Sequence, residues 1–257
     1  MSRDAKHVLE TRIHDAAAEF GLPNVAYESF QLKHIYSLPL TASDLVYATT
    51  ALLEVPAKSS PGAESVIAGV AAAAPEVLRA ASRSSSEMQA NFWAAYDALH
   101  LRNEAKLKLG LDHAIDVQRA IVRQGTSLIE SRAIVPSGPF RYAFITDSPD
   151  LPYFVHPLAL TKLANFLVDT LREAGKAPKP FVMAALNKDA DSYLVVGVSG
   201  AARFGSVAKN TFGQAFVAAA DATQVSAKFD CFESSFVDVK REDMTNFLEH
   251  LHHDLFA

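Results

Sequence analysis

The sequence has little of several features that define common protein classes. It contains one cysteine, Cys231, in 257 residues. This excludes an internal disulfide or a cysteine-rich zinc site and favours an intracellular, reducing compartment. No stretch approaches the ~18 apolar residues of a bilayer-spanning helix, so we expect no membrane contact. The net charge is -5, without the clustered positive charge that strong duplex binding requires.

Short motifs of nucleotide and acyl-transfer chemistry are also missing. The chain holds no GxxxxGK[ST] loop, no GxGxxG loop and no GxSxG elbow. Three polar stretches contain possible metal ligands, but each has a simpler interpretation. Residues 250–254 are typical of a helix end, residues 111–116 of one polar helix face, and residues 187–192 of a hairpin turn. We therefore predict no catalytic and no metal-binding residue.

The first half of the chain has apolar residues at helical spacing. Ser43 is expected to cap a helix that ends before Pro56. Residues 86–131 predict a long helical stretch, either two helices or one bent helix, with Gly110 and Gly125 as its weak points. Residues 55–65, which combine prolines, serines and a glycine without apolar period, predict a flexible loop. Residues 1–131 are thus expected to be mainly α-helical.

After residue 131 the apolar period changes to two. Four short segments rich in β-branched and aromatic residues predict strands, at residues 140–147, 181–187, 193–199 and 232–240. Helical patterns lie among them, at residues 158–174, 211–222 and 241–255. Strands interleaved with helices predict a layered α/β domain with a mixed sheet. The predicted fold class is therefore α/β, with an α/β domain at residues 132–257.

The turn before the helix at 211–222 is a candidate anion site. The first N–H groups of a helix attract anions, and Lys209 and Asn210 stand beside them. One glycine, Gly213, does not make a glycine-rich loop. An ordinary helix N-cap, with Phe212 packed against Phe216 one turn later, is the simpler interpretation. We keep Lys209, Asn210, Phe212 and Gly213 as candidate binding residues.

Five stretches together resemble the C-terminal half of the cell division control protein 45 family. They are SDLVYATTALLE (43–54), GPFRYAFITDSPDLPYFVHPLALTKLANFL (138–167), FVMAALN (181–187), KNTFGQAFVAAADAT (209–223) and FDCFESSFVDVKREDMTNFLEHL (229–251). The likeness runs with gaps from about residue 10 to the end and is weaker over residues 57–123. Because that family is related to DHH phosphoesterases and RecJ-type exonucleases, the resemblance implies a DHHA1-like domain at 132–257. It also implies a DHH domain upstream of residue 1.

The same resemblance implies a non-catalytic role. Active DHHA1 domains carry a glycine-rich run ending in histidine at the turn into a helix. This chain has residues 210–213 there, followed by Gln214, and no histidine. No catalytic residue, metal or cofactor is therefore carried over. The family implies a nuclear subunit of the eukaryotic replicative helicase that joins the MCM ring and the GINS complex, together with replication-loading factors.

Two other functions stay open at this point. The chain could be a fragment of a DHH-type phosphoesterase or exonuclease, which manganese-dependent cleavage of a phosphodiester would reveal. It could also be a single-stranded DNA-binding module, which would bind with a salt-dependent affinity. Because the chain is acidic, we expect such a contact to be weak.

Overall fold

The computed structural model describes residues 3–20, 40–54, 88–200, 209–230 and 233–254. The chain divides into two compact units, Met1–Val46 and Tyr47–Ala257. The first unit carries helix α1 (Arg3–Glu19) and the beginning of α2 (Ala42–Leu53). In the ranges that the structure describes, no helix has both the length and the apolar character to cross a bilayer. The loop predicted at residues 55–65 lies outside these ranges.

Helix α2 begins with a capping box and not at the predicted cap, Ser43. The N–H of Thr41 donates to the Asp44 carboxylate over 2.8 Å, and the N–H of Asp44 donates to the Thr41 hydroxyl over 3.1 Å. This reciprocal pair satisfies two N–H groups that would otherwise lack partners. Ser43 lies inside the first turn. The prediction was wrong by two residues because the threonine three places before an acid is the stronger start signal.

The helical stretch predicted over residues 86–131 consists of two helices. Residues 88–98 are helical, and residues 99–103 form a turn. Helix α4 (Glu104–Glu130) follows without interruption. The break therefore falls before α4 and not at either glycine.

Gly110 and Gly125 are contact points between helices. Both are buried inside α4. A Cβ atom at Gly110 would lie 2.7 Å from the carbonyl oxygen of Ala48 in α2, and one at Gly125 would lie 2.5 Å from the ring of Phe166. The missing side chains let neighbouring helices approach α4 closely, so the helix tolerates the propensity cost of glycine.

The second unit contains a six-stranded mixed sheet in the order β1-β2-β3-β4-β6-β5. Strands β2 and β3 are parallel, and the other neighbouring pairs are antiparallel. The strands are β1 (Val135–Ser137), β2 (Phe140–Ile145), β3 (Phe181–Asn187), β4 (Ser192–Val198), β5 (Ala227–Phe229) and β6 (Phe236–Lys240). The predicted strands at 140–147, 181–187 and 193–199 are confirmed within two residues, whereas the strand predicted at 232–240 begins only at Phe236. The edge strands β1 and β5 were missed because three residues are too few to display an alternating pattern.

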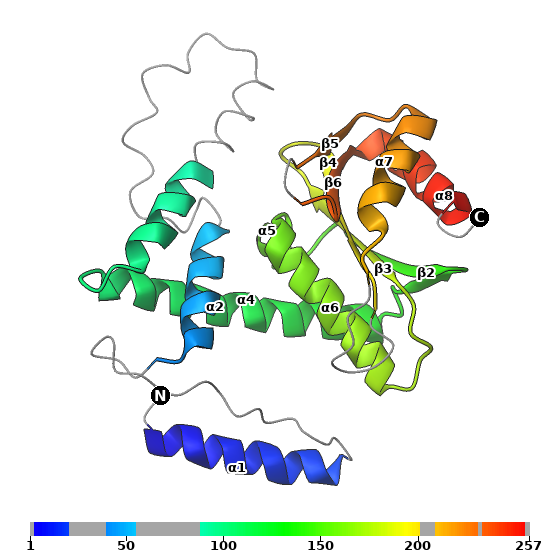
Figure 1. Ribbon diagram of the computed structural model, residues 1–257. Helices are drawn as coiled ribbons and strands as arrows, with labels where there is room; N and C mark the ends of the chain where they lie inside the picture. Colours follow the sequence, from blue (N-terminus) through cyan, green and yellow to red (C-terminus); the bar gives the residue numbers. More distant parts are fainter. Residues whose placement is uncertain (1–2, 21–39, 55–87, 201–208, 231–232, 255–257) are drawn as a thin grey trace, which may run out of the picture. The chain divides into compact units, whose positions relative to one another are not determined.

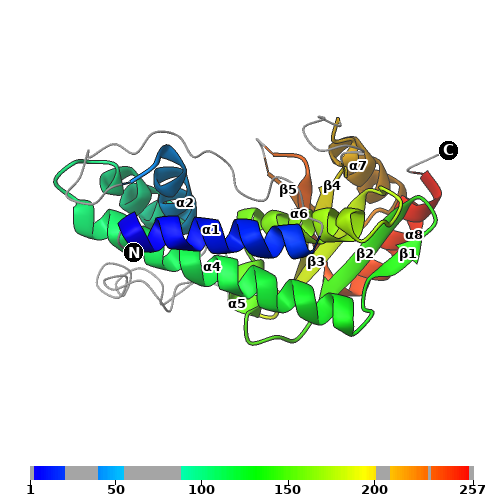
Figure 2. The same ribbon diagram turned by 90° about the horizontal axis from the view of Figure 1, so that it is seen from below.

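Helices cover both faces of the sheet (Figures 1 and 2). Successive residues of β3 alternate between the two faces. Met183 packs with residues of α4 and of α6 (Pro157–Glu173), whereas Val182 packs with residues of α7 (Phe212–Thr223) and α8 (Met244–Asp254). A short helix, α5 (Leu151–Phe154), precedes α6 in the connection from β2 to β3. These layers confirm the predicted α/β class, with helices first and a mixed sheet after them.

Helix α4 and the sheet share one core. Ala120, Ile121 and Leu128 of α4 belong to the same buried cluster as residues of α6 and β3. The predicted boundary at residues 131 and 132 marks the change from helix to strand along the chain. Whether residues 132–257 are a separate DHHA1-like domain stays a prediction.

Candidate functional site

The predicted anion turn at residues 209–213 is held by its own side chains. The side-chain oxygen of Asn210 accepts the N–H of Phe212 over 3.1 Å, and its amide nitrogen donates to the Gly197 carbonyl over 2.9 Å. Thr211, at the N-cap position of α7, makes no side-chain capping bond. Asn210 thus fastens the start of α7 to the end of β4 and occupies an N–H group that an anion would use.

Phe212 points into the core. Its side chain is 1% exposed, and its ring centroid lies 5.4 Å from that of Phe216. This confirms the predicted packing of the two rings one turn apart. A Cβ atom at Gly197 would overlap the ring of Phe212, so the glycine in β4 makes room for it. Phe212 therefore stabilises the fold and does not cover the turn from outside.

Gly213 is also used for packing. It is buried, and a Cβ atom at this position would overlap the side chain of Ser234, which precedes β6. Of the four predicted binding residues, only Lys209 and Asn210 are exposed. The structure brings the four together in one turn, but their role in binding stays a prediction.

The polar stretches singled out in the sequence lie at different places. Within the part of the chain that the structure describes, no group of three His, Cys, Asp or Glu side chains is arranged to hold a metal ion. The side chains of His253 and Asp254 are outside that part. Residues 187–192 form the hairpin turn that was predicted, because the Asn187 side chain accepts the N–H groups of Asp189 and Ala190 over 3.1 and 3.2 Å.

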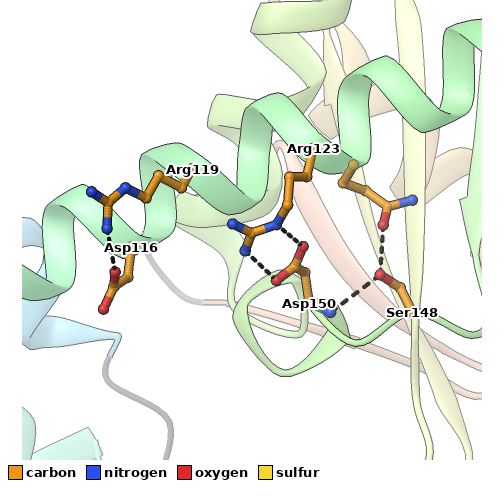
Figure 3. Close-up of polar contacts among 6 residues, drawn as sticks. Asp116, Arg119, Arg123, Ser148 and Asp150 are labelled. Carbon is orange, nitrogen blue, oxygen red and sulfur yellow. Dashed lines mark hydrogen bonds and ion pairs between the residues drawn. The ribbon is translucent and has the colours of Figure 1, made fainter.

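A polar junction that sequence reasoning missed joins α4 to the loop after β2 (Figure 3). The Arg123 guanidinium donates two hydrogen bonds to the Asp150 carboxylate, 3.0 Å from Nε and 2.7 Å from Nη2. The Asp150 side chain is only 11% exposed, and its bond raises the pKa of Arg123. In the same loop, the Ser148 hydroxyl accepts the N–H of Asp150 over 3.2 Å and donates to Gln124 over 2.6 Å. The bidentate pair of Arg123 and Asp150 fixes the start of α5 against α4.

A second missed feature is the carboxylate of Glu54 at the start of α6. It accepts the N–H groups of Leu158 and Ala159 over 2.6 and 2.8 Å. Lys162, one turn along α6, lies with its ammonium 5.4 Å from the ring centroid of Tyr47. Burial raises the pKa of Glu54 to about 7, although the two amides and Lys162 lower it. Glu54 therefore fastens the end of α2 to the first turn of α6.

An open groove lies between the sheet and α8. Three rings line it in edge-to-face contact, with centroids 5.7 Å apart for Tyr142 and Phe144 and 5.5 Å apart for Phe144 and Tyr193. Arg241 and His252 also line the groove, and each has a polar partner within the fold. Arg241 and His252 are thus engaged by the protein itself and are not free to hold a ligand.

Large apolar side chains gather on the helix of residues 88–98 and on the turn after it. We call this set the aromatic surface. Its six side chains are each 51–63% exposed: Met88, Phe92, Trp93, Tyr96, Leu99 and Leu101. Ala95 and Ala98 of the same helix are buried instead. The helix thus buries two alanines and leaves its large apolar side chains exposed, whereas an ordinary amphipathic helix buries its large apolar side chains.

Comparison with known proteins covers nearly the whole chain. The CDC45 family profile matches residues 1–254. The Cell division control protein 45 homolog of Dictyostelium discoideum is 42% identical over 91% of this chain and 33% of its own length. The homolog of Schizosaccharomyces pombe is 34% identical over 98% of this chain and 41% of its own length. The chain therefore spans between a third and about two fifths of these relatives.

A solved structure has the same fold. The crystal structure of CDC45 from Entamoeba histolytica matches with a TM-score of 0.62 at 19% identity, over 98% of this chain and 45% of its own. At that identity the match supports the fold alone, in agreement with the helical region and mixed sheet described above. Together with the profile over residues 1–254, the sequence matches establish that the chain belongs to the CDC45 family.

Proposed function

We propose that the chain is a non-catalytic part of the eukaryotic replicative helicase, acting in the nucleus during DNA replication. In this role it joins the MCM ring and the GINS complex, while another subunit supplies the chemistry. Membership of the CDC45 family supports the proposal. The structural observation that carries its non-catalytic aspect is the packing of residues 209–213.

An anion grip at the start of a helix needs N–H groups that point at the ligand and a backbone that the ligand can approach. In this turn, Asn210 accepts the N–H of Phe212, and Ser234 fills the space beside Gly213. The chain thus uses for packing the place where an active relative would grip its substrate. We propose that Lys209 and Asn210, the exposed residues of the turn, are a remnant binding surface that contacts a protein.

The docking role is tested by titrating purified GINS and purified MCM ring against the immobilised chain, at physiological salt. We expect saturable binding to at least one of them. Lys209→Ala should weaken binding if the turn belongs to the interface. The matched control is Lys176→Ala, at another exposed lysine, which should leave binding unchanged. The absence of saturable binding to both probes would contradict the docking role.

The non-catalytic role is tested with a phosphodiester substrate in the presence of manganese. We expect no turnover by the chain, because the residues of the turn are engaged with one another and with β4. Turnover that follows the protein through purification, and that changes with Lys209→Ala, would instead support the phosphoesterase alternative.

A further inference from the structure

We propose that the aromatic surface is a docking site for the apolar face of an amphipathic helix from another helicase subunit. The proposal rests on the proposed function, which supplies the partner, and names the part of the chain that receives it. It is independent of the turn at residues 209–213.

The aromatic surface is formed in advance. The Lys106 ammonium pairs with the Asp97 carboxylate over 2.7 Å, and the Asn103 amide donates to the Asp97 carbonyl over 2.8 Å. The Asn91 amide donates to the carbonyl of Leu53 in α2 over 3.3 Å. These bonds hold the helix of residues 88–98 at both the turn and α2 (Figure 1). A partner would therefore meet a helix that is already held in place and would not have to order its backbone.

The spacing of the side chains matches a helical ligand. Met88, Phe92 and Tyr96 follow one another at steps of four and lie along one side of the helix. Trp93 stands beside this row, with its ring centroid 5.3 Å from Phe92 and 5.8 Å from Tyr96. A ridge of this kind packs against the i, i+3 and i+4 positions of a second helix.

The charges around the aromatic surface favour a protein over a nucleic acid. Over residues 88–103, the charged side chains are Asp97 and Arg102. Asp97 is already paired with Lys106. Stacking of single-stranded bases on aromatic rings is normally combined with a row of cations along the phosphates. A nearly neutral, mainly apolar surface lacks that row and instead complements an apolar helix face.

The size of the surface argues against a second copy of the chain. A fully buried aromatic side chain covers roughly 150–250 Å², so the three half-exposed rings offer roughly 300 Å², and the three smaller apolar side chains add less than that. A stable two-protein interface needs about 800 Å² from each partner. The aromatic surface is thus too small for self-association alone and is suited to one helix within a larger interface. Exposed rings of this kind are typical anchors of such interfaces.

Trp93 offers a direct probe, because it is the only tryptophan of the chain. The chain is produced with 5-fluorotryptophan, and its single ¹⁹F resonance is followed while purified GINS or purified MCM ring is added. We expect the resonance to shift or broaden and to become shielded from a soluble paramagnetic agent. Binding seen by interferometry without any change at Trp93 would overturn the inference.

A second test removes the rings. We expect the variant Phe92→Ala, Trp93→Ala, Tyr96→Ala to bind its partner at least tenfold more weakly. The control replaces three other exposed apolar side chains by alanine: Ile115, Val122 and Val217. We expect the control to bind like the unchanged chain. Circular dichroism and the melting temperature should stay similar in both variants, because the replaced side chains are exposed.

The outcomes separate this inference from the proposed function. If the unchanged chain binds and the three-ring variant binds equally well, the inference is wrong and the proposed function stands. If the unchanged chain binds neither GINS nor the MCM ring, both are wrong. A dimer in light scattering that the three-ring variant loses would replace the helix by a second copy. If the unchanged chain binds a single-stranded oligonucleotide and the three-ring variant does not, the ligand of the aromatic surface is a nucleic acid and not a helix.

Discussion

Replacing Glu54 by glutamine should change how the stability of the fold depends on pH. In the folded state the pKa of Glu54 is raised from 4.5 to about 7, mainly by burial. Between these two values the folded chain keeps the proton that the unfolded chain has lost. The free energy of unfolding contributed by Glu54 is therefore full below pH 4.5 and falls as the pH rises towards 7.

The magnitude follows from the two pKa values. At about 1.4 kcal/mol for each pH unit between them, the loss is roughly 3 kcal/mol for a fully buried group. Glu54 is half-buried, and solvent screening reduces the effect, so we expect roughly 2 kcal/mol. Glutamine has no such proton to lose, and the Glu54→Gln variant should lack this contribution at every pH.

The assay is urea unfolding of both proteins between pH 4 and pH 8. The difference in unfolding free energy, unchanged chain minus variant, should fall by roughly 2 kcal/mol over this range, while the groups common to both cancel. Glu130→Gln, at an exposed site of α4, is the matched control. A difference that rises with pH would refute the reasoning. It would mean that the two amides of α6 and Lys162 outweigh burial and keep the carboxylate charged.

Two further predictions concern the packing of α4. A methyl group in Gly125→Ala would lie 2.5 Å from the ring of Phe166, so thermal unfolding should show a loss of stability of about 1–3 kcal/mol. The additional substitution Phe166→Leu should partly restore the stability. Full stability of Gly125→Ala alone would count against the close approach of α4 and α6. Arg123→Ala should lower the melting temperature by leaving the Asp150 carboxylate without its bidentate partner. Arg123→Lys should recover only part of that loss, because an ammonium cannot reproduce the planar pair of bonds, and equal stability of all three proteins would contradict a role for the junction.

Most elements of the sheet domain could be predicted because their patterns are local. Residues 181–186 are all apolar, and they are indeed buried on both faces of the sheet. Helix α6 shows the apolar spacing of a helix with one buried side, and the predicted bounds differ from the observed Pro157–Glu173 by one residue at each end. Where the signal was short or ambiguous, as at β1 or at the cap of α2, the prediction failed.

The candidate site was only partly accessible to sequence reasoning. The turn at residues 209–213 could be found, because a lysine, an asparagine and a glycine stand before a helical pattern. Sequence reasoning could not show that Phe212 fills a space left by Gly197, because the two residues come from different elements and meet only in the folded chain. The aromatic residues of 88–98 were visible as part of a helix, but their spacing did not reveal which side of that helix would be covered.

The sequence by itself determined most of the elements, their order, the α/β class and the family, because helical and strand periods are properties of neighbouring residues. The tertiary structure alone decided which side chains were brought together. Glu54 meets the N–H of Leu158 across 104 positions of the chain, and Arg123 meets Asp150 across 27. It also decided that Ala95 and Ala98 are buried, whereas the rings of the same helix are exposed. Burial depends on what distant segments bring to a surface, and no local period carries that information.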